Sequence, residues 1–548
     1  MIAATAGTGD GVRGSGSKVA DVAGCCVLLL LIALYVPACL DLDRHPEEDA
    51  AMLLRYSGHL ADGHGIVWNI GERPVDGATD FLFMVLVAAV HGAGVGLERA
   101  AQGVGLVAHA ATVLVVFLAA RRLFVASLAL ALLSAVFLAV GPGLRHLAAG
   151  YGTPLFALAC GLTFVLAVRL AHAPAERLSR AALAFSLAGL AAGLARPEGV
   201  FFAVFCLAAL VHARRGLGAR TILGRFLLVF LTLGLAYFAW RFSYFGYPLP
   251  NPFYKKGAGV LHWHSLRQSG RDLFHLGLPF VAVVLVGPFV RATRRMALLT
   301  LLPVVAFVCL FVLISDETNY VMRFRYPVLP AILLGWIPVW QGAFAPRFAR
   351  WPRWLAAAGA AAAIVGLSLV QHQRFLYLEP RRMGLYDAAL VLRDYSRYNY
   401  ALVTTEAGLL PFYSTWRAVD AWGLNDSFVA HHGGITDEYL DRYRPEVIMF
   451  HAYFSPGTPE AGARIENRSL GPAWYRMVMT LKSYSERNRY VLAAVFGRNA
   501  YDTHYYYVRS GFARSREITD RIRALDYQWD GGPTLDLAAA AREAGEPR

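Results

Sequence analysis

The chain has 548 residues, of which 57% are hydrophobic and 16% are charged, and its mean hydropathy is +0.44. A water-soluble domain of this size could not bury so much apolar surface, whereas each helix that crosses a bilayer needs about 20 apolar residues. The net charge of +14 comes from short arginine clusters between apolar runs, which is typical of cytoplasmic loops and argues against nucleic-acid binding. Composition therefore predicts a polytopic α-helical membrane protein.

Twelve apolar runs follow an N-terminal tail of residues 1–21, and they predict about 11–13 transmembrane helices between residues 22 and 372. The runs cover residues 23–40, 79–97, 102–119, 125–140, 154–171, 181–194, 200–212, 222–242, 276–290, 296–314, 327–342 and 355–370.

Arginine clusters between these runs predict the topology. The clusters lie at residues 121–122, 177–180, 214–220, 291–295 and 347–353. They are expected in the cytoplasm with the N-terminal tail, which leaves the acidic loop 41–79 and the segment after residue 371 outside. Two full spans between this loop and Arg121 would place Arg121 outside. Either run 79–97 is a broken, re-entrant span or the arginine pair breaks the rule, and the sequence His91-Gly92-Ala93-Gly94 favours the broken span.

The composition becomes polar after residue 371. Short apolar strands at 400–405, 446–452, 490–496 and 504–508 alternate with helical stretches at 436–443 and 474–484. This alternation predicts a small extracytoplasmic α/β domain at residues 373–548, with a largely parallel sheet. The six cysteines lie in or beside apolar runs and form no CxxC pair, so zinc and disulfide frameworks are disfavoured.

The acidic loop 41–79 carries the first candidate site. Glu48 and Asp49 follow the first apolar run, and apolar residues then recur at helical spacing over residues 48–61. The spacing predicts an amphipathic helix on the membrane surface with Arg55 on its polar side. Acids at a helix N-terminus are favoured by the helix dipole even without a function. As a site, Glu48 and Asp49 suit a metal ligand or a carboxylate base.

Two short motifs beside predicted spans hold further candidates. Thr153 lies in a tight turn that ends at Pro154, where the start of a helix is an equally good explanation. Arg196 and Glu198 flank Pro197 within a hydrophobic stretch. Charges in such a position face a cavity or a partner, or they pair with each other at an interfacial turn.

Two outer segments supply positive charge that could bind a lipid-linked phosphate. The candidate residues are Asn251, Tyr254, Lys255, Lys256, Arg323 and Arg325, together with Arg55 of the acidic loop. Lysine is a compact point charge that suits a phosphate, although attraction to anionic lipid headgroups explains the lysines nearly as well. Positive charge is disfavoured in outer loops, so the two arginines are harder to explain as topology signals.

The acidic loop resembles the first outer loop of a GT-C type membrane glycosyltransferase family. The similar residues are Glu48-Asp49-Ala50, Arg55-Tyr56 and the stretch 63–73, which ends in Glu72 and Arg73. This family includes the actinobacterial arabinofuranosyltransferases and is more distantly similar to protein mannosyltransferases and aminoarabinose transferases. Residues 151–155, 195–199, 247–255 and 419–426 resemble it too. The chain departs from the family at Gly152, where members carry an acid, and at Asp80, which replaces part of an aromatic stretch.

The resemblance implies a GT-C transmembrane domain and an inverting glycosyltransferase of the bacterial inner membrane. Asp49 or Glu48 would be the base, and a single sugar, arabinofuranose or another pentose or hexose, would move from a polyprenyl phosphate to an envelope glycan or protein. No cofactor is implied with certainty, and a divalent metal is left open. The competing functions are a non-enzymatic transporter or assembly scaffold for lipid-linked glycans, and an oligosaccharide ligase.

The C-terminal domain is expected to bind the acceptor on the same side of the membrane as the acidic loop. Trp416, Trp422, Tyr453 and Phe454 are candidates to stack on sugar rings, with burial in the core as the competing role.

Overall fold

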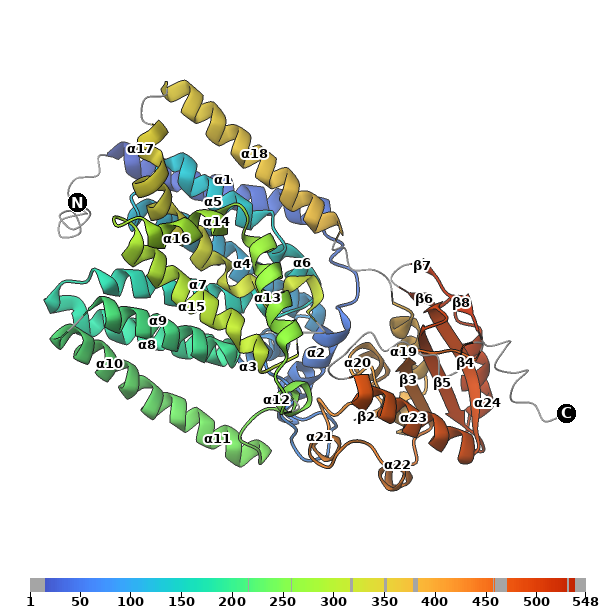
Figure 1. The fold of residues 1–548 in the computed structure, drawn as a ribbon. Coiled ribbons are helices and arrows are strands. Elements are labelled where there is room, and N and C mark those ends of the chain that lie inside the picture. Colours follow the sequence, from blue (N-terminus) through green and yellow to red (C-terminus); the bar gives the residue numbers. More distant parts are fainter. Residues whose placement is uncertain are drawn as a thin grey trace.

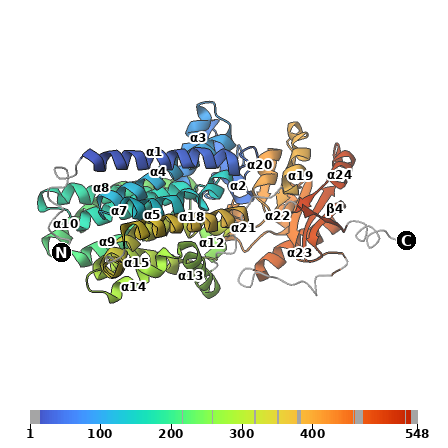
Figure 2. The same ribbon diagram turned by 90° about the horizontal axis from the view of Figure 1, so that it is seen from above.

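The computed structural model describes residues 15–537, apart from residues 215, 258, 316–318, 349–351, 378–382, 457, 459–470 and 530–531. A bundle of long helices occupies the N-terminal two thirds of the chain, and a sheet flanked by helices lies beyond one end of that bundle (Figures 1 and 2). This is the predicted class, a polytopic helical membrane protein with a C-terminal α/β part.

The long helices of the bundle follow the apolar runs of the sequence. They are α1 (Ser15–Cys39), α4 (Leu97–Arg122), α5 (Leu128–Ala139) with α6 (Gly143–Ala148), α7 (Thr153–Ala171), α8 (Ala175–Ala195), α9 (Glu198–Ala213), α10 (Leu217–Val229) continuing through a π-turn into α11 (Leu235–Phe245), α13 (Trp263–Gly277) with α14 (Phe280–Val286), α15 (Arg294–Cys309), α16 (Leu329–Val339) and α18 (Arg353–Tyr377). In the described part of the chain, nine helices are long and apolar enough to cross a membrane. The bent pair α13 and α14 raises this number to ten, and α9 is apolar but shorter.

Apolar side chains on the outside of the bundle mark its lipid-facing surface. Leu231 is 63% exposed and Phe242 is 48% exposed, both on the continuous α10–α11 helix. A water-soluble protein rarely exposes a contiguous apolar surface of this length. The bundle is therefore built for a hydrocarbon environment.

The run at residues 79–97 does not form one helix. Helix α3 (Phe81–Gly92) has 12 residues, about 18 Å at 1.5 Å per residue, which is too short for a hydrocarbon core of about 30 Å. The chain turns at Gly94, where φ is +99°, and α4 then crosses the bundle. One crossing thus separates the acidic loop from Arg121, so Arg121 lies at the opposite end of the bundle.

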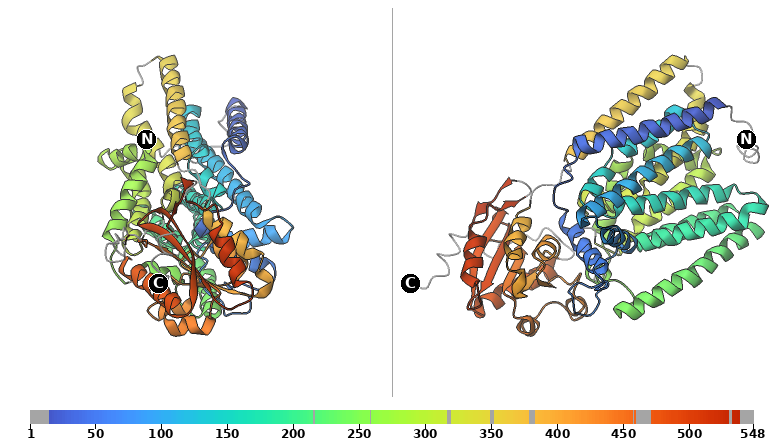
Figure 3. Two further views of the ribbon diagram at one scale, coloured as in Figure 1. Left: turned by 90° about the vertical axis from the view of Figure 1, so that its right-hand side faces the viewer. Right: turned by 180° about the vertical axis from the view of Figure 1, so that it is seen from behind.

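Helix α2 (Glu48–Ala61) lies between the bundle and the C-terminal sheet (Figures 1 and 3). The prediction of a helix over these residues is confirmed, but its placement on the membrane surface is wrong. Leu54 and Tyr56 are fully buried, and Arg55 is 6% exposed. The helix is buried on several sides because the C-terminal domain covers the face that the sequence pattern assigned to water.

The C-terminal part is a sheet with helices on both faces. Its strand order in the described residues is β2-β1-β3-β5-β4-β8. These strands are β1 (Ala401–Thr404), β2 (Arg417–Asp420), β3 (Val447–Ala452), β4 (Tyr490–Asn499), β5 (Asp502–Arg509) and β8 (Leu535–Asp536), with a separate pair β6 (Gln528–Trp529) and β7 (Gly532–Pro533). Strands β2, β1 and β3 are parallel, whereas β5, β4 and β8 join antiparallel. The expected largely parallel sheet is therefore mixed, because β4 and β5 form a tight hairpin.

The helices of this part pack in two layers, one on each face of the sheet. They are α19 (Gly384–Arg393), α20 (Leu409–Ser414), α21 (Ser427–His431), α22 (Asp437–Tyr443), α23 (Gly471–Arg487) and α24 (Ser515–Arg523). Residues of α19, α20 and α24 share one apolar cluster with the sheet, and residues of α22 and α23 share another. Residues at the carboxyl ends of β1, β2 and β3 line the same cavity as the first turns of α2.

Candidate functional site

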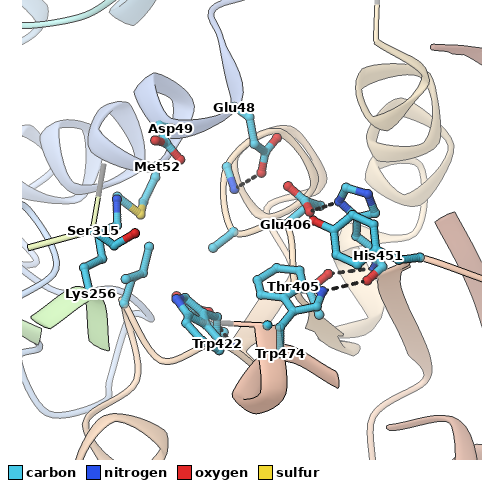
Figure 4. Close-up of a pocket in the computed structure, with 16 residues that line it drawn as sticks. Glu48, Asp49, Met52, Lys256, Ser315, Thr405, Glu406, Trp422, His451 and Trp474 are labelled. Atoms are coloured by element: carbon cyan, nitrogen blue, oxygen red, sulfur yellow. Dashed lines mark hydrogen bonds and ion pairs between the residues drawn. The ribbon is translucent and has the colours of Figure 1, made fainter. Parts of the chain in front are cut away.

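A cavity of about 420 Å³ lies between the helical bundle and the C-terminal sheet. The bundle contributes Glu48, Asp49, Met52, Lys256 and Ser315, and Figure 4 shows these side chains facing Glu406, Trp422, His451 and Trp474 across the cavity. Glu406 and Trp422 follow the carboxyl ends of the parallel strands β1 and β2, and His451 lies next to the carboxyl end of β3. Open α/β sheets commonly bind ligands at this edge. The acidic loop and the strand ends thus share one cavity.

Asp49 lies in the first turn of α2 and forms an ion pair with Arg323. Arg323 is 7% exposed and Asp49 is 30% exposed, so the arginine lies behind the carboxylate. Burial alone would raise the pKa of Asp49, but Arg323, followed by Lys256, outweighs burial and lowers that pKa below its usual value. Asp49 is therefore a carboxylate at neutral pH, at the wall of the cavity.

Arg323 is held in place by aromatic rings as well as by Asp49. Its guanidinium lies 4.4 Å from the ring centre of Tyr151 and 4.8 Å from that of Phe324. Arg196 lies 5.4 Å from the same Phe324 ring. Two arginines therefore flank one aromatic side chain at this end of the bundle, next to Asp49.

Arg196 binds two further candidate acids. Its guanidinium donates to Asp80 at 2.6 Å and to Glu198 at 3.0 Å. A Cβ atom at Gly152 would lie 2.7 Å from the Asp80 carboxylate. Asp80 therefore occupies the space that a side chain at position 152 would need. Position 152 is the one at which members of the family that the acidic loop resembles carry an acid.

Glu48 joins α2 to the C-terminal domain. Its carboxylate accepts hydrogen bonds from the backbone N–H groups of Gly408 and Leu409, the latter at 2.8 Å. Burial, followed by the neighbouring Glu406, raises the pKa of Glu48 well above its usual value. A Cβ at Gly408 would clash with the Glu48 carbonyl oxygen, so the close approach requires glycine. Glu48 lines the cavity, but its carboxylate oxygens already accept hydrogen bonds from the backbone of the C-terminal domain.

The predicted cationic segment forms a short helix, α12 (Asn251–Gly257), beside the cavity. Lys256 lines the cavity, and burial lowers its pKa although Asp49 opposes that effect. The Lys255 ammonium lies 4.4 Å from the ring centre of Trp422. Two predicted phosphate-binding lysines are thus placed at the cavity, one within its lining and one behind an aromatic wall.

The polar partners of these lysines face the C-terminal domain. The Asn251 side-chain oxygen lies 3.3 Å from His431 Nε2, and the Tyr254 ring packs edge-on against the same histidine at 4.6 Å. Tyr247 stacks on His431 at 3.7 Å. These residues dock α12 on α21, so they position Lys255 and Lys256 without reaching the cavity.

Other sequence-predicted residues lie away from the cavity. Arg325 is fully buried, 3.8 Å from the ring centre of Phe311, and Thr153 is buried at the first residue of α7. Glu72 pairs with Arg417 at 2.6 Å, and Arg73 is exposed. The structure gives Arg325 and Thr153 packed positions in the bundle, and Glu72 a surface contact with the C-terminal domain.

Arg55 connects the acidic loop to the C-terminal domain. Its guanidinium donates to the carbonyl of Trp68 at 2.8 Å and to the Asn69 side chain at 3.0 Å, both within the loop. It also donates to the carbonyl of Trp416 at 2.9 Å and to that of Pro411, both in the domain. Arg55 is thus a buried latch, by which we mean a buried side chain whose hydrogen bonds join the acidic loop to the C-terminal domain.

Two residues of the far wall, Asp420 and Trp474, were not predicted as site residues from the sequence. Asp420 accepts hydrogen bonds from the backbone of Trp422, Gly423 and Asn425, which shapes the turn that presents Trp422. Trp422 and Trp474 lie 5.2 Å apart and both line the cavity. Asp420 was visible only as part of the motif at residues 419–426, because its role depends on backbone geometry.

The aromatic residues expected to contact sugars divide into two groups. Trp422 and Tyr453 line the cavity. Trp416 and Phe454 are 1% and 2% exposed, and both belong to apolar clusters of the domain. Burial is therefore the role of the second pair.

His451 is a further residue of the far wall. Its Nδ1 lies 3.1 Å from Glu406, and its Nε2 lies 2.6 Å from Asp502. Burial alone would lower the pKa of His451, but the hydrogen bonds with Asp502 and Glu406 outweigh burial and raise that pKa to about 9.

The comparisons with known proteins agree with this architecture. Residues 372–510 match a family model described as Domain of unknown function (DUF8728). No curated protein sequence matches the chain.

Three solved structures are similar in fold. ArnT from Cupriavidus metallidurans in the apo state has a TM-score of 0.59 and 15% identity, and the match covers 88% of this chain and 98% of that chain. ArnT bound to undecaprenyl phosphate has a TM-score of 0.53 and 14% identity, over 91% and 100% of the two chains. The Archaeoglobus fulgidus oligosaccharyltransferase tethered with an acceptor peptide has a TM-score of 0.50 and 12% identity, over 89% and 74%. The chain has the GT-C fold of membrane glycosyltransferases.

Proposed function

We propose that this chain is a membrane glycosyltransferase that moves a single sugar from a polyprenyl-phosphate donor to an acceptor hydroxyl. The observation that carries the proposal is the ion-paired, ionised Asp49 at a cavity that also holds Lys256. A carboxylate base beside cationic groups is what transfer from a sugar phosphate requires. The ArnT structure with undecaprenyl phosphate supports a lipid-phosphate ligand for this fold.

In the proposed reaction, Asp49 accepts the proton of the acceptor hydroxyl while that oxygen bonds to the anomeric carbon of the donor. The bond between this carbon and the phosphate oxygen breaks, and its electron pair leaves with the lipid phosphate. Attack from the face opposite the phosphate inverts the anomeric configuration. A carboxylate of lowered pKa suffices as base, because the acceptor hydroxyl becomes more acidic as its oxygen bonds to carbon.

The cationic residues would stabilise the departing phosphate. Lys256 is in the lining, and Arg323 contacts Asp49 from behind. Arg323 is 7% exposed and lies behind Asp49, so it would act on the phosphate through its charge and not through a direct contact. Lys255 adds charge behind Trp422. In many enzymes, fixed charges placed where the transition state develops opposite charge lower the barrier more than any other single effect.

The acceptor would lie against the C-terminal domain. Trp422, Trp474 and Tyr453 form an apolar and aromatic wall opposite Asp49. The cavity of about 420 Å³ is near the lower end of small-ligand pockets, which span roughly 300–1,000 Å³. That size favours transfer of one sugar over transfer of a whole oligosaccharide, and the alternatives of a transporter or scaffold gain no specific support from it.

The cavity would face the outside of the cell. Arg121 and Arg122 end α4 at the other end of the bundle, and the arginines before α15 and α18 follow the same alternation. The positive-inside rule places that end in the cytoplasm. Domain limits of 22–372 for the transmembrane part and 373–548 for the extracytoplasmic part are proposed on the same basis, in the bacterial inner membrane.

The experiment uses purified full-length protein and a panel of radiolabelled polyprenyl-phosphate pentoses and hexoses, with envelope glycan and protein fractions as acceptors. We expect one donor to lose its label to an acceptor, and the product to have the opposite anomeric configuration. Absence of transfer from every donor in the panel, or a product of retained configuration, would contradict the proposal.

A further inference from the structure

Three adjacent strands bring a histidine-rich cluster together next to the cavity. His451 on β3 is the direct cross-strand partner of His504 on β5. Glu406 follows β1, which pairs with the other edge of β3. One donor atom from each of these three residues lies within 4.8 Å of the others. Since paired residues of neighbouring strands project from the same face, the strand register alone places the two imidazoles together.

The donor set suits a divalent transition metal. Two histidines and one glutamate are the ligands of several zinc sites that keep a fourth position open. Ligand atoms around a tetrahedral zinc ion are roughly 3.4 Å apart for metal–ligand bonds near 2.1 Å. The separation of His451 Nδ1 and Glu406 is 3.1 Å, so this edge already has about the required length.

The outer contacts of the histidines leave the right nitrogens for a metal. His451 Nε2 lies 2.6 Å from the Asp502 carboxylate, and Asp502 is held in turn by Arg498 at 2.6 Å. His504 Nδ1 lies 2.6 Å from the Tyr527 hydroxyl. A ring N–H that donates to a carboxylate or another oxygen is the usual device that fixes the tautomer of a metal-binding histidine. His451 Nδ1 and His504 Nε2 are thereby directed at the cluster.

Burial and access also fit a bound ion with an open position. His504 is 3% exposed, and the Trp529 ring packs on it at 4.0 Å. His451 and Glu406 line the cavity, where Figure 4 shows them side by side. One side of the cluster is therefore closed by protein, and the other opens toward the cavity. A water molecule or another oxygen from the cavity would complete the coordination.

We propose that Glu406, His451 and His504 bind a divalent transition metal ion, with zinc favoured by the donor set, in the far wall of the cavity. Asp502 and Tyr527 orient the two imidazoles. The proposal concerns the C-terminal domain and stands independently of sugar transfer. The competing explanation is a metal-free cluster in which a protonated His451 is held between two carboxylates.

The test measures metal binding by tag-free, full-length protein in detergent. The protein is stripped with a chelator, dialysed against Zn²⁺ or Co²⁺ and analysed for bound metal, and the absorption of bound Co²⁺ reports its coordination. We expect one ion per chain and the spectrum of a four- or five-coordinate site. Glu406→Gln and His504→Ala should weaken binding at least tenfold, and Asp502→Asn by about 10–100-fold because Asp502 orients His451. His432→Ala, an exposed histidine outside the cluster, is the matched control.

Two results would overturn the proposed metal site. One is wild-type protein that binds no stoichiometric metal, and the other is metal binding by Glu406→Gln and Asp502→Asn that is as tight as in wild type. If His504→Ala does not fold, Glu406→Gln decides, because the amide keeps the size of the side chain and can still hydrogen-bond to His451. The assay contains no sugar, so its failure leaves the transferase proposal intact. Failure of sugar transfer would likewise leave the metal result intact.

Discussion

The buried latch at Arg55 allows a quantitative test of how the cavity is assembled. Arg55→Met keeps the length of the side chain and removes its donors. Two of those donors reach carbonyls of the C-terminal domain, at Trp416 and Pro411. A hydrogen bond from a charged donor contributes about 1.5–3 kcal/mol, so roughly 3–6 kcal/mol of docking free energy is at stake. This is a large part of the roughly 5–15 kcal/mol that stabilises a typical domain.

Arg417→Met is the matched control for this change. Arg417 also joins the C-terminal domain to the acidic loop, through Glu72, but it is 45% exposed and Glu72 is 30% exposed. Exposed ion pairs contribute about 0–1 kcal/mol. Burial is thus the main difference between the two arginine contacts, and the predicted effects differ severalfold.

The assay is hydrogen exchange of the full-length protein, followed by mass spectrometry of peptides from the loop at 62–80 and from residues 409–416. We expect Arg55→Met to lose protection in both peptides and to melt at a lower temperature, whereas Arg417→Met stays close to wild type. Equal protection from hydrogen exchange in the two variants would show that Arg55 does not hold the acidic loop to the C-terminal domain.

Three further predictions concern catalysis and topology. Lys256→Met should raise KM for the lipid donor more than it lowers kcat, as expected for a contact that binds substrate and transition state alike; an unchanged KM would return Lys256 to a structural role. Arg323→Met removes the charge that lowers the pKa of Asp49, so that pKa should rise and the acid limb of kcat/KM should move to higher pH; an unmoved limb would contradict the assignment. In intact cells, an impermeant thiol reagent should label a cysteine at Asp43 but not one at Glu176, in a background without the native cysteines; the opposite pattern would invert the topology.

Much of the bundle could be predicted because lipid exposure leaves a strong signal in sequence. The run at 79–97 shows the limit of that signal. Its composition is as apolar as that of a full span, and only the turn at Gly94 and the count of crossings reveal that α3 stops short. Charge alternation along the whole chain resolves the ambiguity, because it depends on all the spans together.

The candidate site was predictable mainly on the side of the helical bundle, and on the opposite side only for Trp422 and Tyr453. Glu48, Asp49 and Lys256 come from short motifs, and the structure brings all three to the cavity. Arg55 belongs to the same motif as Glu48 and Asp49, but its side chain lies in the interface with the C-terminal domain. The periodicity of a helix cannot show that a second domain covers its polar face. A pattern of polar and apolar residues reports burial, not the identity of the covering surface.

The histidine cluster shows why the remaining residues of the C-terminal side were not predicted. His451 and His504 are 53 residues apart in the numbering of the sequence, and no short motif joins them to Glu406. Their proximity depends on the register of β3 and β5 and on the parallel pairing of β1 with β3. Register is a property of the assembled sheet, so ligands that it assembles leave no local spacing to recognise.

The role of Asp49 as the base for sugar transfer is tested by the rate of the purified Asp49→Asn protein with a saturating lipid donor. Asparagine keeps the shape of the side chain but cannot accept the proton, so kcat should fall by about 10²–10⁴ while the protein still folds and binds donor. Asp43→Asn is the matched control in the same loop, because Asp43 is 88% exposed and pairs with Arg99 on the surface; it should retain wild-type turnover. Near-normal turnover by Asp49→Asn would exclude Asp49 as the base.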